Sequence, residues 1–285
     1  MSSTNKKLSF AFFGTPEFAT LVLKQLIAAG FSPALVVTTP DKPAGRGLAL
    51  TPSPVKQFAA NEHIPVLQPE KLDSAFIATL QEKNIELIIT AAFGKILPDS
   101  LLAVGKYPPL NVHPSLLPKY RGTSPVESQI LADEQDVGVS VIHMDAEMDH
   151  GPIVAQKKVV IQNWPISRDA LNEILWTEGG RLVAEILPSW IEGNSKETPQ
   201  DHTEATITKK ISKTDGLINQ ADPDREKYLK YLAYEGWPGT YFFIEKNGKQ
   251  LRIKITDAEF ADGQFIIKKV IPEGKKEMEY KDFVK

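Results

Sequence analysis

The sequence from residue 8 to residue 39, LSFAFFGTPEFATLVLKQLIAAGFSPALVVTT, decides the fold. Its apolar run at 8–13 predicts a buried strand that ends in the tight turn 14–17. Apolar residues then recur at helical spacing until Gly30, which ends the helix. Residues 34–39 predict a second short buried strand. This β-α-β unit indicates a parallel sheet with a right-handed crossover, so the expected fold class is α/β.

The same pattern continues through the first two thirds of the chain. Apolar runs predict strands at 87–92, 138–144 and 153–161, and apolar periodicity predicts a long helix at 168–191. The first turn contains Gly14 but lacks the G-x-G-x-x-G pattern, so the dinucleotide-binding fingerprint is absent. We therefore expect a Rossmann-like sheet that need not bind NAD.

Composition limits the chemistry that this chain can perform. The 285 residues are 42% hydrophobic and 24% charged, which is ordinary for one large or two smaller globular domains. The absence of cysteine excludes disulfides, thiolate metal sites and cysteine nucleophiles. No apolar stretch approaches the length of a membrane span, and the N-terminal region lacks a signal-peptide pattern. We expect a cytoplasmic protein with no membrane partner.

A second, smaller domain is expected after a polar segment. Residues 193–207 contain few apolar side chains and predict a linker. Residues 208–285 hold short strands and an Asn247-Gly248 turn, which predict a small antiparallel sheet or partial barrel. This part carries a net charge of +3, against −6 for residues 1–207. A basic region permits contact with nucleic acid, although a solvated charged surface explains the charge equally well.

Residues 39–54 form a long stretch rich in proline and glycine, with Arg46 between two glycines. Long loops without secondary structure are usually functional or disordered. A guanidinium on a glycine hinge suits a phosphate or a nucleic-acid backbone, whereas the alternative is a mobile surface loop with an incidental arginine.

Polar side chains follow three of the predicted strands, at 93–98, 111–122 and 145–152. Asn111 and His113 project to the same face of an extended segment because the strand period is two. Ligands in open α/β sheets lie at the carboxyl ends of the strands, so we expect these loops to line one crevice. Their carboxylates and histidines could bind a metal, although no H-E-x-x-H or comparable spacing exists. Alternatively, an amide, an imidazole and a carboxylate could provide acid–base and oxyanion chemistry for acyl transfer to an amine.

Several motifs in the sequence resemble a known family. N-V-H followed by S-L-L-P-x-x-R-G at 111–122, and M-D-x-x-M-D-x-G at 144–151, resemble the signatures of the 10-formyltetrahydrofolate-dependent formyltransferases. Narrower motifs resemble the branch of that family that acts on methionyl-tRNA. These are F-G-T-P-E-F at 13–18, P-D-K-P-A-G-R-G at 40–47, P-S-P-V-K at 52–56, K-K-I-S-K-x-D-G at 209–216 and P-E-G-K-K-x-M at 272–278.

The resemblance implies a role for each matching residue, and it implies no metal. The catalytic set would be Asn111, His113 and Asp149. The co-substrate 10-formyltetrahydrofolate would be held by Phe93, Gly94, Lys95, Ile96, Leu97, Ser115, Leu116, Leu117, Pro118, Met144 and Asp145. The tRNA would be contacted by Arg46, Lys42, Lys209, Lys210 and Lys213.

The resemblance also implies an architecture and a reaction. A Rossmann-like formyltransferase domain at 1–192 would be joined by the linker 193–207 to an OB-like barrel at 208–285. The enzyme, a monomer, would transfer a formyl group to the α-amino group of methionyl-initiator tRNA. The alternatives are a sugar-amine N-formyltransferase and a tRNA-binding protein that has lost catalysis.

The sequence departs from the family pattern in three places. Leu48-Ala49 follows Arg46-Gly47 where lysines are usual, so this loop carries less positive charge for phosphates. His150 stands beside Asp149 where threonine is favoured. The region before the P-E-G-K-K motif is shortened, so we expect a trimmed second domain.

Overall fold

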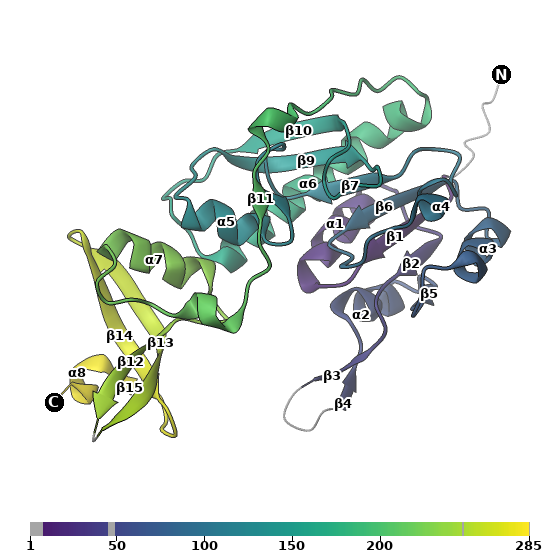
Figure 1. The fold of residues 1–285 in the computed structure, drawn as a ribbon. Coiled ribbons are helices and arrows are strands. Elements are labelled where there is room, and N and C mark those ends of the chain that lie inside the picture. Colours follow the sequence, from purple (N-terminus) through teal and green to yellow (C-terminus); the bar gives the residue numbers. More distant parts are fainter. Residues whose placement is uncertain (1–7, 45–48, 247, 285) are drawn as a thin grey trace. The chain divides into compact units, whose positions relative to one another are not determined.

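The computed structural model describes residues 8–44, 49–246 and 248–284 (Figure 1). The chain forms two compact units. The first unit comprises Met1–Arg121, Gly138–Val159 and Asn172–Thr206, and the second comprises Gly122–Val137, Val160–Leu171 and Ile207–Lys285. The predicted division into 1–192, 193–207 and 208–285 stays a prediction. The two units differ from it because the chain enters the second unit twice before its C-terminal part.

The first unit is built on a seven-stranded, mostly parallel sheet. Its strand order is β10-β9-β7-β6-β1-β2-β5, and β1 pairs in parallel with both β2 and β6. Strand β7 pairs in parallel with β6 but antiparallel with β9. The strands are β1 (Phe10–Gly14), β2 (Leu35–Val37), β5 (Val66–Leu67), β6 (Leu87–Ala91), β7 (Leu110–His113), β9 (Val137–His143) and β10 (Ile153–Val159). The predicted Rossmann-like sheet is confirmed.

Alternate residues of β1 pack on opposite faces of this sheet, as the strand period of two requires. Phe10 and Phe12 belong to a core cluster shared with Val22 of α1 and Leu187 of α6, whereas Phe13 packs with Phe76 of α3 on the other face. The helices of this part are α1 (Glu17–Ala28), α2 (Pro54–Asn61), α3 (Ser74–Glu82), α4 (Asp99–Leu102) and α6 (Arg168–Ile191). Among the described residues, no helix combines the length and apolar character needed to cross a bilayer.

The proline- and glycine-rich stretch at 39–54 is not free of secondary structure, which corrects the expectation of an irregular loop. Strands β3 (Lys42–Ala44) and β4 (Ala49–Thr51) pair as an antiparallel hairpin that projects from the sheet (Figure 1). Pro43 is compatible with this hairpin because proline is tolerated in edge strands. Arg46 lies outside the described residues.

Polar side chains fix the base of this hairpin. Lys56 Nζ lies 2.7 Å from Asp41 Oδ2 and donates to Gln68 Oε1 at 2.6 Å. Gln68 Nε2 donates to Asp41 Oδ1 at 2.6 Å and to the Thr39 carbonyl at 2.9 Å. The P-S-P-V-K motif therefore supplies, through Lys56, an anchor for the hairpin that precedes it.

The second unit contains a small antiparallel sheet in the order β12-β13-β14-β15. Its elements are α5 (Pro125–Leu131), α7 (Asp224–Ala233), β12 (Tyr241–Lys246), β13 (Lys249–Ala261), β14 (Gln264–Pro272), β15 (Met278–Glu279) and α8 (Tyr280–Phe283). Strand β13 has a register irregularity near Asp257. Phe242, Ile253 and Val270 form the centre of its core. The small C-terminal β domain is confirmed.

Two short strands, β8 (Arg121–Gly122) and β11 (Ile207–Thr208), form a separate sheet.

A polar cluster joins segments of the second unit that are distant in sequence. Asp133 Oδ1 accepts hydrogen bonds from Arg225 Nη2 at 2.8 Å and from Trp164 Nε1 at 2.8 Å, and Oδ2 accepts from Arg225 Nε at 3.1 Å. The bonds from Arg225 hold the pKa of Asp133 below its usual range, although partial burial opposes this. This bidentate pair ties α7 to the turn after α5.

Arg225→Met should lower the free energy of unfolding by about 1 kcal/mol at neutral pH, since both charges are partly exposed and screened by solvent. A depressed carboxyl pKa stabilises the folded state above the unfolded pKa, and the effect is lost as pH falls through the folded pKa. The difference between variant and wild type should therefore shrink below about pH 4. Urea unfolding at both pH values measures it, with exposed Lys276→Met as the matched charge control. Equal stabilities at neutral pH would contradict the assignment.

Candidate active site

Three side chains of the first unit meet at one carboxylate oxygen. Asp149 Oδ1 accepts a hydrogen bond from Asn111 Nδ2 at 3.2 Å and lies 3.4 Å from His113 Nδ1. The His113 and Asp149 side chains are 5% and 10% exposed, so water screens their interaction weakly. The predicted catalytic residues are thus brought together as an amide, an imidazole and a carboxylate, and their catalytic roles remain predictions.

The route by which Asp149 reaches this point differs from the expected one. The carboxyl ends of parallel strands meet at one edge, but β9 is antiparallel to β7, and its last residue, His143, pairs with Leu110 at the start of β7. The loop after β9 therefore starts beside the opposite end of β7. It reaches the site because Asn111 and His113 project from one face of β7, and Asp149 closes over that face.

Both ring nitrogens of His113 face acceptors. Nε2 lies 2.9 Å from the Tyr120 carbonyl oxygen, and Nδ1 faces the Asp149 carboxylate. A carbonyl and a carboxylate only accept, so this environment favours the doubly protonated ring. Burial is the largest single influence and lowers the pKa of His113, but the charge and hydrogen bond of Asp149 and the Tyr120 carbonyl together raise it above its usual value. The arrangement is a buried histidine–carboxylate pair that favours the protonated imidazole.

Thr90 of β6, which the sequence did not single out, fixes the orientation of the Asn111 amide. Thr90 pairs with Asn111 in the parallel register of β6 and β7. Its Oγ1 donates to Asn111 Oδ1 at 2.6 Å, the shortest of its contacts. Because Oδ1 then faces a donor, Nδ2 faces Asp149. The sequence alone does not indicate this contact, because it depends on the register in which β6 pairs with β7.

The loop that carries Asp149 is tightly shaped. Asp149 has a φ of +53°, which is uncommon for residues other than glycine. A Cβ on Gly151 would lie 1.9 Å from the His143 carbonyl oxygen, so only glycine fits there. Asp145 Oδ1 accepts from the Glu147 amide at 3.0 Å, and Asp145 Oδ2 lies 2.6 Å from His150 Nδ1. The Asp145 carboxylate therefore connects the Glu147 amide to the His150 ring within the loop.

Gln200 lies in the predicted linker 193–207 and is only 6% exposed. Its Nε2 donates to the carbonyl oxygens of Asp149 at 2.9 Å and Gly151 at 2.7 Å. Its Oε1 accepts from Arg121 Nε at 3.1 Å and from Arg121 Nη2 at 2.7 Å. Nothing in the polar composition of the segment indicates this contact.

The residues expected to hold folate occupy varied environments. Phe93 and Leu97 are buried in the core cluster that contains Phe13, and Ile96 is 73% exposed. Lys95 Nζ donates to the carbonyl oxygens of Pro69 and Glu70, each at 2.9 Å. These contacts fix the loop at 93–98, whose Gly94 has a φ of +81°.

The segment 115–118 is packed against β9. Ser115 is fully buried, and its Oγ donates to the Lys119 carbonyl at 2.7 Å. The Leu117 amide donates to Ser140 Oγ at 3.1 Å. A Cβ on Gly138 would lie 2.5 Å from Leu116 Cδ2, so Leu116 fills the space beside that glycine. Pro118 accepts at its carbonyl oxygen from the Thr206 amide at 3.3 Å.

An open cavity of about 390 Å³ lies near the start of β7, and Asn111, His113 and Asp149 are not among the residues that line it. Its lining includes Leu102, Tyr107, Pro109, His143 and Met144. Met144 Sδ is 3.4 Å from Thr90 Oγ1, so the cavity wall also touches the residue that orients Asn111. Of the residues predicted to hold folate, Met144 is the one that lines this cavity. The described residues contain no group of three His, Cys, Asp or Glu side chains placed to hold a metal ion.

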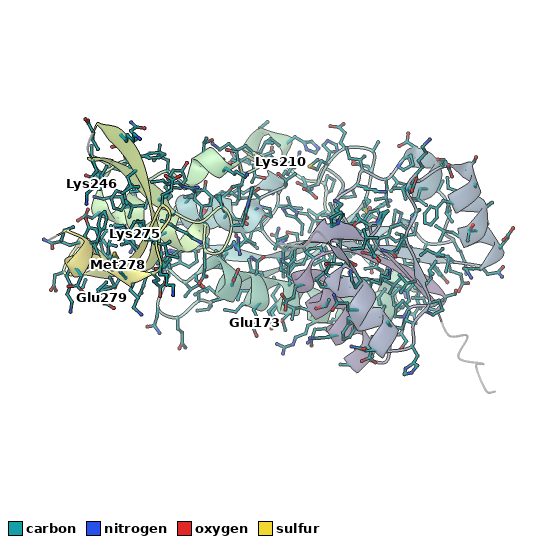
Figure 2. All side chains as sticks on the ribbon, turned by 90° about the horizontal axis from the view of Figure 1, so that it is seen from below. Glu173, Lys210, Lys246, Lys275, Met278 and Glu279 are labelled. Carbon is teal, nitrogen blue, oxygen red and sulfur yellow. The ribbon has the colours of Figure 1, made fainter. Side chains whose placement is uncertain are left out.

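The lysines expected to contact tRNA are all exposed. Lys42 lies on β3, and Lys209, Lys210 and Lys213 follow β11. Lys209 Nζ pairs with Asp215 at 3.1 Å. Figure 2 labels Lys210 among the side chains that extend from the ribbon. Exposure leaves these cations accessible to an anionic partner.

Comparison with known proteins shows the family of this chain. The formyl transferase family model matches residues 6–186. Methionyl-tRNA formyltransferase from Staphylococcus aureus is 40% identical over 88% of this chain and 79% of the relative, and that from Chloroflexus aurantiacus is 42% identical over 88% and 81%. The chain belongs to the formyl transferase family, on its methionyl-tRNA formyltransferase branch. The family resemblance stated from the motifs is confirmed.

A solved structure shares the fold of this formyl transferase. The N-formyltransferase from Helicobacter canadensis, in complex with folinic acid and dTDP-3-aminofucose, aligns with a TM-score of 0.62 at 19% identity. The match covers 91% of this chain and 95% of that chain. At this identity the likeness shows the fold alone, and it leaves the acceptor substrate to other observations.

Asp149→Asn should lower the pKa of His113, because burial then acts without the opposing carboxylate charge. A raised histidine pKa stabilises the folded state most below the unfolded pKa, and the effect is lost as pH rises through the folded pKa. The stability difference between wild type and variant should therefore shrink as pH rises above about 6.5. Imidazole NMR titration of the five histidines, with His113→Asn for assignment, measures the pKa directly. An unchanged His113 pKa would exclude Asp149 as its cause.

Thr90→Val should reduce formyl-transfer turnover by about tenfold to 10²-fold, since the Asn111 amide loses the donor that orients it. Thr90→Ser keeps the hydroxyl and should retain most of the activity. Steady-state kinetics of both variants test this, with melting temperature as the control for folding. Equal turnover for Val and Ser would show that the hydroxyl does not orient the amide.

Proposed function

We propose that this chain transfers the formyl group of 10-formyltetrahydrofolate to the α-amino group of methionyl-initiator tRNA, for the initiation of translation. The observation that carries the proposal is the meeting of Asn111, His113 and Asp149 at one oxygen, in a chain 40–42% identical to methionyl-tRNA formyltransferases. An inactive tRNA-binding protein would have no need to keep an amide, an imidazolium and a carboxylate buried together.

The geometry suits addition of an amine to a formyl carbon. The amine nitrogen forms a bond to that carbon, and the carbonyl oxygen becomes an oxyanion. The remaining N–H of Asn111 Nδ2 and the His113 imidazolium supply positive electrostatic potential for that oxygen. When the bond from carbon to the folate N10 breaks, the amine loses one proton and N10 gains one.

Asp149 is the group suited to carry this proton. Both ring nitrogens of His113 already face acceptors, so the ring offers no open position at which to take the amine proton. The Asp149 carboxylate accepts the amine proton, directly or through a water, and passes it to N10. His113 keeps the carboxylate ionised and ready to accept. In this mechanism, His113 stabilises the oxyanion electrostatically, and Asp149 carries the proton.

The cavity beside Met144 is the proposed entry of the folate ring system. Its volume of about 390 Å³ lies within the range of small-molecule sites, and Leu102 and Pro109 provide apolar walls. The segments 93–97 and 115–118 would complete the folate site, and Asp145 would shape the loop over it. Because Met144 also touches Thr90, a ligand in this cavity would lie close to the oriented amide of Asn111.

The acceptor is proposed to be tRNA because of features outside the catalytic set. Strand β3 carries exposed Lys42, and exposed lysines follow β11. Arg46, which lies outside the described residues, adds a further cation to the same stretch of sequence. Positive charge of this kind suits a phosphate backbone. We further propose that the enzyme works as a cytoplasmic monomer. A sugar-amine acceptor is the alternative, and its support is a likeness of fold to sugar N-formyltransferases at 20% identity or below.

Incubation with 10-formyltetrahydrofolate and either methionyl-initiator tRNA or an amino-sugar nucleotide should yield a formylated product only with the tRNA. Asn111→Ala, His113→Ala and Asp149→Ala should each lower turnover by about 10²–10³, the usual effect of losing one oxyanion donor or its partner. Glu147→Ala, exposed on the same loop, is the matched control and should keep normal turnover. Formylation of the sugar alone would overturn the acceptor, and normal turnover in all three alanine variants would overturn the catalytic set.

A further inference from the structure

Gln200 uses its whole hydrogen-bonding capacity in one place. Its two Nε2 hydrogens go to the carbonyl oxygens of Asp149 and Gly151, and its Oε1 receives two bonds from Arg121. Arginine only donates and carbonyls only accept, so the amide has one possible orientation. A reversed amide would place oxygen against two carbonyls and nitrogen against a guanidinium. Gln200 can therefore make all four hydrogen bonds only when the 149–151 backbone and the Arg121 guanidinium are both in place.

The contact acts on the part of the backbone that aims the catalytic carboxylate. Asp149 is held at a φ of +53°, a conformation that persists only where the surroundings enforce it. Gln200 binds the carbonyl of Asp149 itself and the carbonyl two residues later. These two bonds fix the peptide planes that follow the Asp149 Cα. A rotation there would swing Asp149 Oδ1 away from Asn111 and His113.

A second contact from the same segment supports the loop. The rings of His202 and His150 stack with centroids 4.1 Å apart and planes within 2°. Arg121 Nη2 lies 2.9 Å from His202 Nδ1 as well as 2.7 Å from Gln200 Oε1. Because Arg121 donates, His202 Nδ1 must accept. Arg121, itself 6% exposed, therefore holds both side chains that contact the loop.

We propose that Gln200, oriented by Arg121, is a positioning residue that sets the backbone of the 149–151 loop and thereby holds the Asp149 carboxylate against Asn111 and His113. This inference rests on the proposed catalytic role of Asp149. It assigns a function in the reaction to a segment whose sequence suggests only a connection. Gln200 does not touch the reacting atoms and acts through the loop.

The segment can lose this contact and stay in place. Ile153 and Thr198 exchange two backbone hydrogen bonds, each of 2.8 Å, before Gln200. After it, the Thr206 carbonyl accepts from the Arg121 amide at 2.8 Å, and Thr206 Oγ1 accepts from the Tyr120 amide at 2.7 Å. Substitution of Gln200 should therefore disturb the loop at 149–151 more than the path of the chain.

Two variants separate the halves of the interaction. Gln200→Glu keeps an acceptor for Arg121 but faces two carbonyls with a carboxylate, whereas Gln200→Met keeps the length and removes both halves. Each variant should lower kcat by about 10-fold to 10²-fold, the range expected when a catalytic group is displaced by about 1 Å. The KM values for folate and tRNA should change less than about twofold, because Gln200 does not touch either substrate. Glu204→Gln, exposed on the same segment, is the matched control and should match wild type.

The readout that a purely structural role would not move is the pKa of His113, followed by imidazole NMR without any substrate. Gln200→Met, which adds no charge, should lower it as Asp149 moves away. The melting temperature should fall because buried polar groups lose a partner, and it serves to show that the variant is folded at the temperature of the assay. The positioning role alone would be overturned if the folded Gln200→Met variant kept the wild-type kcat and the wild-type His113 pKa while Asp149→Ala still lost turnover. Normal turnover in Asp149→Ala would instead overturn the proposed catalytic set.

Discussion

The carboxylate oxygen Asp149 Oδ1 is the constraint on which the site depends. Asn111 and His113 reach it from one face of β7, where the strand period places them together. Asp149 reaches it from a loop whose start lies at the other end of that strand. The loop succeeds because Gly151 lets the backbone pass against the His143 carbonyl and because Asp149 adopts a positive φ. The loop from His143 to Gly151 must therefore follow a path that brings Asp149 Oδ1 to Asn111 and His113.

The buried ion pair explains why so many polar groups surround this point. A buried pair of charges gives weak net stability, because desolvation offsets much of the attraction. It persists where further hydrogen bonds satisfy the remaining donors and acceptors. The Tyr120 carbonyl does this for His113, and Thr90 does it for the Asn111 amide. The surroundings therefore favour a protonated imidazole beside an ionised carboxylate, although the pair adds little to the stability of the fold.

Sequence patterns predicted the elements with the strongest local signal. Apolar runs located β1, β2 and β6, and the period of two placed Asn111 beside His113. Asp149 came from motif resemblance. The direction of β9 was not predictable, because its residues are buried almost throughout and read like a central parallel strand. The β3–β4 hairpin was missed because glycine and proline in 39–54 resemble loop composition. Thr90 and Gln200 were missed because their partners are distant in sequence.

Gln200 shows why polar composition is a poor guide to exposure. A segment such as 193–207 has little apolar area, so its burial yields little hydrophobic free energy. Gln200 is nevertheless buried within it, because its side chain hydrogen-bonds two carbonyls of the 149–151 loop and the Arg121 guanidinium. The reason for its position lies in the loop at 149–151 and in Arg121. A connecting segment of this kind becomes part of the catalytic geometry through complementarity of donors and acceptors, which no property of the segment alone reveals.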